Sequence, residues 1–178
     1  MTLEKHIVDT IKEWQLKIGV SKEILRLYYP KESICLYLHL PENTDNALLQ
    51  QKTESYIREH ASYLKGTQVS YQKDRFCVAV SEAGSRYVAE HVELPSFLAL
   101  FLAAIKKQDM EAVRSVFRDY AREHHGTYIE DREEDGLGTV FYFEQEELDA
   151  YAYCVEQDVF GVTYHRFARE DYERLLEK

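Results

Sequence analysis

The spacing of the apolar residues changes at Gly126, and this change constrains the fold more than any other feature of the sequence. Before Gly126, apolar side chains recur every three or four residues, as on one face of an α-helix. After it, apolar and polar residues alternate, as in strands that bury one face. Helices followed by a run of strands predict an α+β fold.

Four alternating segments follow Gly126, and short polar turns separate them, which predicts an antiparallel meander with a tight turn around Gln157 and Asp158. The segments cover residues 127–133, 138–145, 149–157 and 159–167. A short helix, REDYERLLE, is expected to end the chain. The sheet is expected to pack on the helix predicted over 96–107, which is apolar on nearly every side and which Ser96 is expected to cap.

The chain before Gly126 is mainly helical, with one β-hairpin predicted over 67–81 around a Lys73-Asp74 turn, and a further helix from Ser81. The segment ESICLYLHL fits a strand or a buried helix, and the helix is favoured. Caps and spacing predict other helices over 3–18 (capped by Thr2), 22–29 (closed by Pro30), 45–65 (ended by Gly66) and 109–125 (capped by Asp109, with His124 inward).

A chain of 178 residues fits a single domain, 1–178. The best place for a boundary is VELP at 92–95, which would separate residues 1–92 from a helix-plus-sheet segment over residues 93–178. The chain is −10 in formal charge, and residues 130–149 hold nine acids against one base. Such a field repels phosphate backbones, so nucleic-acid binding through that region is not expected.

The three cysteines lie far apart in apolar runs with no CxxC spacing, which indicates buried free thiols in a reducing compartment. No apolar signal segment or membrane-spanning run is present, so a cytoplasmic protein without membrane association is expected.

The Asp131–Gly136 stretch matches the start of a calcium loop, but Tyr142 stands where a carboxylate ligand is required. A solvated acidic hairpin turn is the preferred interpretation.

Chemistry-bearing motifs are absent from the sequence: no nucleophile elbow, phosphate-binding loop or metal-ligand spacing is found, so no catalytic residue, cofactor or metal is expected. Two surface hypotheses remain. Arg114, Arg118 and Arg122 form a basic stripe at helical spacing, which suits an anion or acidic partner, although pairing with the chain's own acids is favoured. An aromatic platform on the final sheet is the second, with ordinary packing as its alternative; its tyrosines are Tyr142, Tyr151, Tyr153 and Tyr164.

Four segments, LYYPKES, DRFCVAVSEAG, VFYFEQ and YHRFAREDYERL, resemble a family of small proteins from anaerobic Gram-positive bacteria that is classed as a domain of unknown function. The resemblance spans nearly the whole chain but implies no catalytic residue. A helix ending in YLKG, the hairpin and SEAGSRYVAEH also resemble the last helix, the wing and the following helix of winged-helix domains, over about residues 3–91. In DNA-binding members, the helix before the wing enters the major groove.

The leading hypothesis is a non-catalytic protein-interaction module with a basic protein partner, because no catalytic constellation is found. The alternative is a winged-helix regulator that binds DNA through residues 45–65 and the wing at 72–75, although the exposed charges of that helix are nearly balanced. A third possibility is a small hydrolase that uses His124 or His165 with carboxylates. The sequence does not indicate an oligomeric state.

Overall fold

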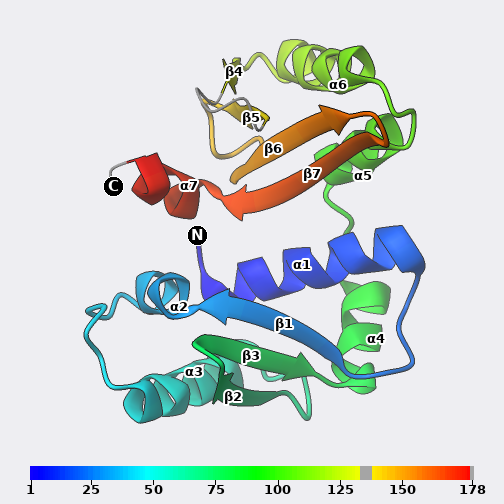
Figure 1. The fold of residues 1–178 in the computed structure, drawn as a ribbon. Helices are drawn as coiled ribbons and strands as arrows, with labels where there is room; N and C mark the ends of the chain where they lie inside the picture. The colour runs from blue at the N-terminus through cyan, green and yellow to red at the C-terminus, as the bar shows by residue number, and fades with distance from the viewer. Residues whose placement is uncertain (133–137, 177–178) are drawn as a thin grey trace. The chain divides into compact units, whose positions relative to one another are not determined.

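The computed structural model describes residues 1–132 and 138–176 (Figure 1). The chain has an α+β architecture, as predicted, with helices and a small sheet followed by helices and a four-stranded antiparallel sheet. It divides into two compact units, Met1–Leu94 and Pro95–Lys178. The division lies within the VELP segment.

The first unit builds a three-stranded antiparallel sheet with the strand order β1-β3-β2. Strands β2 and β3 form the predicted hairpin, and Lys73 and Asp74 at its turn have positive φ angles of 48° and 63°. This backbone conformation matches the twist of a two-residue hairpin. In order, the elements are α1 (Leu3–Ile18), β1 (Leu25–Pro30), α2 (Lys31–Tyr37), α3 (Asn46–His60), β2 (Gln68–Gln72), β3 (Arg75–Val80) and α4 (Glu82–His91).

The helix predicted over 22–29 is wrong, because this segment forms strand β1. Its side chains alternate between buried and exposed from Leu25 to Pro30, and Leu25 lies opposite Val80 of β3 in the antiparallel register. A six-residue segment is too short for the spacing of its apolar residues to distinguish helical from strand periodicity. Pairing with a strand about 50 residues later therefore decides its structure.

Helices α2 and α3 are both found, with α3 shorter than expected. The helix favoured for ESICLYLHL is confirmed as α2, although it begins one residue earlier, at Lys31, and ends at Tyr37. Helix α3 ends at His60 rather than near Gly66, and it buries Leu49, Thr53 and Ile57, while His60 is exposed.

Side-chain caps begin most of the predicted helices. Thr2, Ser81 and Asp109 each accept a hydrogen bond from a backbone N–H of the first turn, as expected. Ser96 does not cap α5, because Pro95 occupies the N-cap position and makes no side-chain cap. The Ser96 hydroxyl instead lies 3.0 Å from the Tyr120 hydroxyl.

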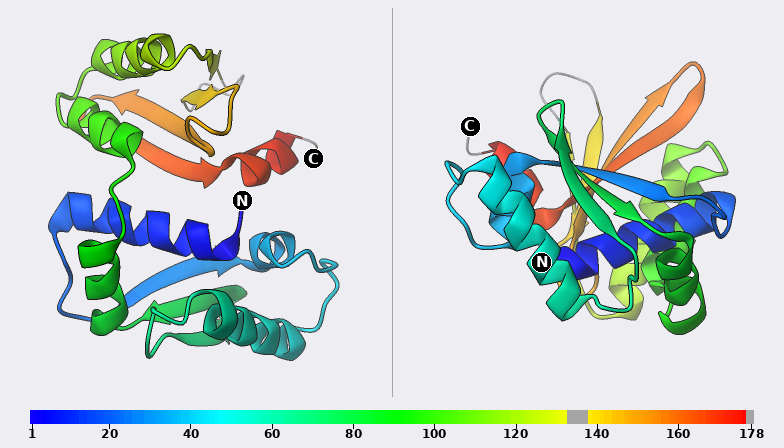
Figure 2. Two further views of the ribbon diagram at one scale, coloured as in Figure 1. Left: turned by 180° about the vertical axis from the view of Figure 1, so that it is seen from behind. Right: turned by 90° about the horizontal axis from the view of Figure 1, so that it is seen from below.

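The second unit confirms the predicted meander, with the strand order β4-β5-β6-β7 and antiparallel pairing throughout. Figure 2 shows the hairpin of β6 and β7 from two further sides. The elements are α5 (Ser96–Ile105), α6 (Met110–Glu123), β4 (Tyr128–Arg132), β5 (Thr139–Phe143), β6 (Tyr151–Asp158), β7 (Gly161–Ala168) and α7 (Arg169–Leu176).

Helices cover both faces of this sheet. On one face, aromatic rings of α5 and α6 pack on the strands: the Phe101 and Tyr153 ring centroids are 4.4 Å apart, and those of Phe117 and Phe141 are 5.1 Å apart. On the other face, Tyr172 of α7 packs in a cluster with Val140, Ala152 and Cys154. Since neighbouring residues of a strand point to opposite faces, Val140 and Phe141 lie in the two different layers.

The turn between β6 and β7 lies two residues later than predicted. Strand β6 continues to Asp158, whose Oδ1 accepts hydrogen bonds from the Phe160 and Gly161 N–H groups at 2.7 and 3.1 Å. The turn exposes 93% of Val159 and 93% of Phe160. The side-chain amide of Gln108, in the loop between α5 and α6, donates to the Val162 carbonyl and accepts from the Val162 N–H. The end of the hairpin next to the turn is therefore held in place.

Candidate binding site

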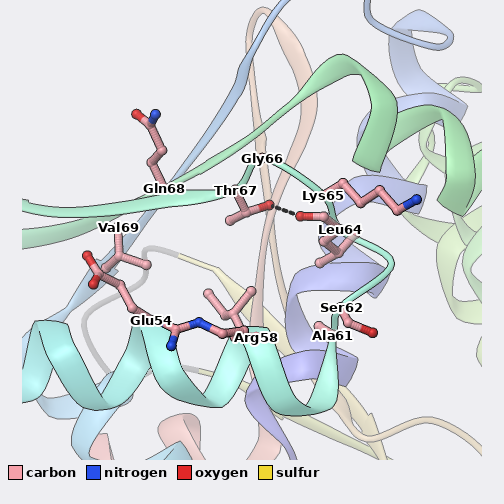
Figure 3. Close-up of a pocket in the computed structure, with 11 residues that line it drawn as sticks. Glu54, Arg58, Ala61, Ser62, Leu64, Lys65, Gly66, Thr67, Gln68 and Val69 are labelled. Carbon is pink, nitrogen blue, oxygen red and sulfur yellow. Dashed lines mark hydrogen bonds between the residues drawn. The ribbon is translucent and has the colours of Figure 1, made fainter.

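A groove of about 500 Å³ lies in the first unit between the end of α3 and the beginning of β2 (Figure 3). Figure 3 shows Glu54 and Arg58 reaching up from the helix and Val69 pointing down towards it, while Gln68 points away. Helix, loop and strand all contribute side chains. The lining residues are Glu54, Ile57, Arg58, Ala61, Ser62, Leu64, Lys65, Gly66, Thr67, Gln68 and Val69.

The loop that closes one side of the groove is held by its own hydrogen bonds. The Thr67 hydroxyl donates to the Leu64 carbonyl at 2.7 Å, and Gly66 adopts a positive φ of 74°, which favours glycine. The Ser81 hydroxyl, which also caps α4, donates to the carbonyl of Lys65. These contacts fix the chain between α3 and β2, so the groove is built into the fold.

Two cations line this groove, and neither has a counter-ion among the described residues. Neither Arg58 nor Lys65 has a carboxylate within 4.0 Å in the described regions of the chain. Glu54, the acid of the groove, accepts a hydrogen bond from the Gln50 amide at 3.1 Å instead. The lining therefore carries a net positive charge in a protein of charge −10. A ligand with a negative group would be favoured there.

Strand β2, next to the groove, is an edge of its sheet, because β3 lies on one side of it and no strand of the described chain lies on the other. Its sequence, QVSYQ, contains neither a charged residue nor a proline. The other edge strands do: Arg26 and Pro30 in β1, Glu130 in β4 and Arg166 in β7. Charges and prolines are the usual protection of an edge against pairing with another chain.

The three arginines of the α6 stripe form ion pairs with acidic residues of the same chain. Arg114 Nε donates to Glu130 Oε1 of β4 at 2.9 Å, Arg118 lies 3.3 Å from Glu111, and Arg122 lies 3.0 Å from Asp119. This is the internal pairing that the sequence favoured. An external anion would have to compete with these carboxylates, so an anion site at this stripe stays a prediction, and the groove is the stronger candidate.

The four candidate tyrosines do not share one surface. Tyr151 and Tyr153 are 3% and 0% exposed, so both belong to the core, and burial with the nearby Asp149 carboxylate raises the Tyr153 pKa. Tyr164 is half-buried, with its ring 4.9 Å from that of Phe101. Tyr142, on the opposite face, lies under the Arg169 guanidinium at 3.9 Å. The expected platform on one face is corrected to two packed layers.

Tyr142 has a strongly polarised environment. Its hydroxyl donates to Asp131 Oδ2 at 3.0 Å. Burial, together with the Asp131 carboxylate, raises the pKa of Tyr142 to about 12. The phenol is therefore neutral at physiological pH and acts as a hydrogen-bond donor.

The histidines considered for hydrolysis are on the surface. His124 is exposed rather than inward, with its ring 4.2 Å from that of Tyr120, and His165 is exposed on β7 opposite Cys154. Neither lines the groove around Arg58, nor the two smaller grooves that contain Trp14 and Tyr87. Across residues 1–132 and 138–176, no three His, Cys, Asp or Glu side chains are grouped to hold a metal ion. The calcium-like stretch falls largely outside the described residues.

A second groove, of about 320 Å³, lies beside the end of α1 and is more apolar. Trp14, Ile18 and Ile24 line it and are 43%, 66% and 52% exposed. Trp14 and Ile18 continue the apolar spacing of the helix predicted over 3–18, which predicts that they are buried. Both instead reach the surface, because they lie near the helix end.

Within the described residues, no helix by itself has the length and apolar content to cross a membrane, although α4 and α5 taken together, with a bend between them, meet that test on length and composition.

No curated protein and no solved structure matches the chain. A family model, described as "Domain of unknown function, E. rectale Gene description (DUF3877)", matches residues 1–176 and confirms the resemblance to an uncharacterised bacterial family. The chain belongs to this family.

Proposed function

We propose that this chain is a cytoplasmic, non-catalytic protein-binding module, and that it binds its partner at the groove between α3 and β2. The observation that carries the proposal is the coincidence, at one place, of a preformed groove, an unprotected strand edge and two cations that have no counter-ion among the described residues. Each of these features favours the binding of a ligand. The groove is lined by neither cysteine nor histidine.

The order α1-β1-α2-α3-β2-β3, with the sheet order β1-β3-β2, supports reading the first unit as a winged-helix domain, in which α3 and the β2–β3 hairpin form the binding side. Winged-helix folds bind nucleic acids or proteins, so the fold alone does not distinguish these two classes of ligand and the charges of the site have to be considered. Helix α3 has two bases, Lys52 and Arg58, against two acids, Glu54 and Glu59. This balance favours a protein partner over a phosphate backbone.

The expected partner also changes. A basic protein was predicted from the acidic composition, but the groove carries Arg58 and Lys65, for which the described residues supply no counter-ion. We therefore propose an acidic segment in a partner protein as the ligand of this groove.

Site-specific photo-crosslinking tests this proposal. The photoreactive residue p-benzoylphenylalanine replaces Glu54, whose side chain reaches from α3 into the groove, or Gln157, an exposed residue of β6, in the full chain expressed in its native host. We expect a discrete crosslinked protein from position 54 and none of that size from position 157. The crosslink should be lost with Arg58→Glu and kept with Lys52→Glu, a matched charge reversal outside the groove. Equal crosslinking from both positions would contradict the proposal.

DNA binding is the second candidate, because the element order favours it. Fluorescence anisotropy with labelled random-sequence duplex DNA at 50 and 200 mM salt tests it. A winged-helix DNA reader should bind at low salt and lose affinity steeply as salt rises. We expect no such binding. Salt-dependent binding that both Lys52→Glu and Arg58→Glu weaken would support DNA binding instead.

A further inference from the structure

Among the described strands, β2 differs from the other sheet edges because no charged residue or proline protects its free backbone groups. In an antiparallel pair, alternate residues direct their N–H and C=O groups away from the partner strand. In β2, those groups of alternate residues face away from β3, towards the side where no strand of the described chain lies. The strand is five residues long and uncharged, so nothing in its sequence opposes a further strand.

We propose that the ligand of the groove is an extended, acidic peptide segment that adds to the sheet as a fourth strand beside β2. This inference deepens the proposed function and rests on it. Main-chain hydrogen bonds to β2 would supply affinity, and alternate side chains would supply specificity. The β2–β3 pairing continues through Gln72, opposite Arg75, so the whole length of β2 is held in an extended conformation.

The groove specifies which side chains such a strand carries. Side chains of an added strand alternate between the two faces of the sheet. On the face where Val69 points to α3, they meet Ile57 and the Arg58 guanidinium; on the face of Gln68, they meet solvent. The peptide is therefore expected to place an apolar residue and an acidic residue two positions apart, both facing α3.

A second copy of this chain is a poorer occupant. Pairing β2 with β2 of another molecule would bring two sets of Arg58 and Lys65 to the same place, and neither set has a carboxylate within 4.0 Å among the residues described. Like charges in one interface disfavour the complex. It would also offer QVSYQ, which has no acid, to a groove that favours one.

Selection from a phage-displayed library of random nine-residue peptides on the full chain tests the inference. We expect enrichment of peptides with an apolar and an acidic residue two apart. A synthetic peptide from the selection should bind Arg58→Glu about tenfold more weakly and Lys52→Glu within about twofold of the parent chain. Hydrogen exchange of the complex should slow at alternate amides of residues 68–72.

Several results would overturn strand addition: no enriched peptide, a bound peptide that leaves the exchange of residues 68–72 unchanged, or equal binding by Arg58→Glu and Lys52→Glu. Dimerisation of the chain through β2, measured by sedimentation, would also overturn it. These failures are distinct from failure of the proposed function, because the position-54 crosslink would still capture a partner that binds the groove in another conformation.

Discussion

Arg114 of α6 and Glu130 of β4 form an ion pair with a 2.9 Å contact between Nε and Oε1, and both side chains are mostly shielded from water, with 28% and 26% exposed. The pair joins the helix layer of the second unit to the edge of its sheet. Arg122, on the same helix stripe, pairs with Asp119 but is 78% exposed. The three arginines therefore differ in environment although their spacing is regular.

Replacing Arg114 with Ala is expected to lower the free energy of unfolding by about 1 kcal/mol, because a partly shielded carboxylate loses its charged donor. Arg122→Ala should change it by less than about 0.5 kcal/mol, as exposed pairs contribute little. Urea denaturation of the two variants measures both values. Equal losses would mean that the contact with β4 does not distinguish Arg114.

Gly161→Ala is expected to destabilise the β6–β7 hairpin by more than about 1 kcal/mol. Gly161 has a φ of +135°, which L-residues rarely adopt, and an added Cβ would lie 1.8 Å from Gln108 Oε1. The Ala variant should therefore also break the hydrogen bonds of Gln108 to Val162. A double-mutant cycle with Gln108→Ala checks this: the two losses should not add, and full additivity would contradict the shared cause.

The raised pKa of Tyr142 predicts that the free energy of unfolding falls at alkaline pH. Its pKa is raised to about 12 from an ordinary value of 10. The folded state therefore keeps the proton that the unfolded state loses first, so this contribution is complete below pH 10 and is lost as pH rises towards 12. Tyr142→Phe should flatten the fall in the free energy of unfolding over that window. An unchanged slope, measured by denaturation at several pH values, would contradict the environment assigned to this phenol.

Ser81 is expected to matter for the groove as well as for α4. Its hydroxyl caps the helix by accepting from the Gly84 N–H at 3.1 Å, and it donates to the Lys65 carbonyl. Ser81→Ala should cost about 1 kcal/mol and should speed amide exchange in the loop 61–67. Hydrogen exchange resolved by residue tests this, with Thr44→Ala as a control for loss of a local hydroxyl contact elsewhere. Unchanged exchange in the loop would show that Ser81 serves α4 alone.

The fold was largely predictable because most elements carry local signals. Capping residues marked the starts of α1, α4 and α6, and the alternation after Gly126 gave all four strands of the meander. Strand β1 was missed because its six residues are defined by pairing with β3, far along the chain. The turn at Val159 and Phe160 was misplaced because apolar residues are rare at an exposed tip.

The candidate site was less predictable, since it depends on tertiary neighbours. The sequence drew attention to Arg114 and to Tyr153, but the fold pairs the first with Glu130 and buries the second. Arg58 and Lys65 are among the exposed charges of the helix predicted over 45–65. Their position in one groove with Val69 depends on the end of α3 at His60 and on the edge position of β2. The positive φ favoured by Gly66 was the local signal of that turn.

The crosslinking yield at position 54 is the measurement that tests the central claim most directly, because it reports on the groove without knowledge of the partner. We predict one partner protein crosslinked at position 54, absent at position 157 and absent when Arg58→Glu is combined with the position-54 probe. A partner captured equally in the Arg58→Glu background, or captured only at position 157, would contradict it.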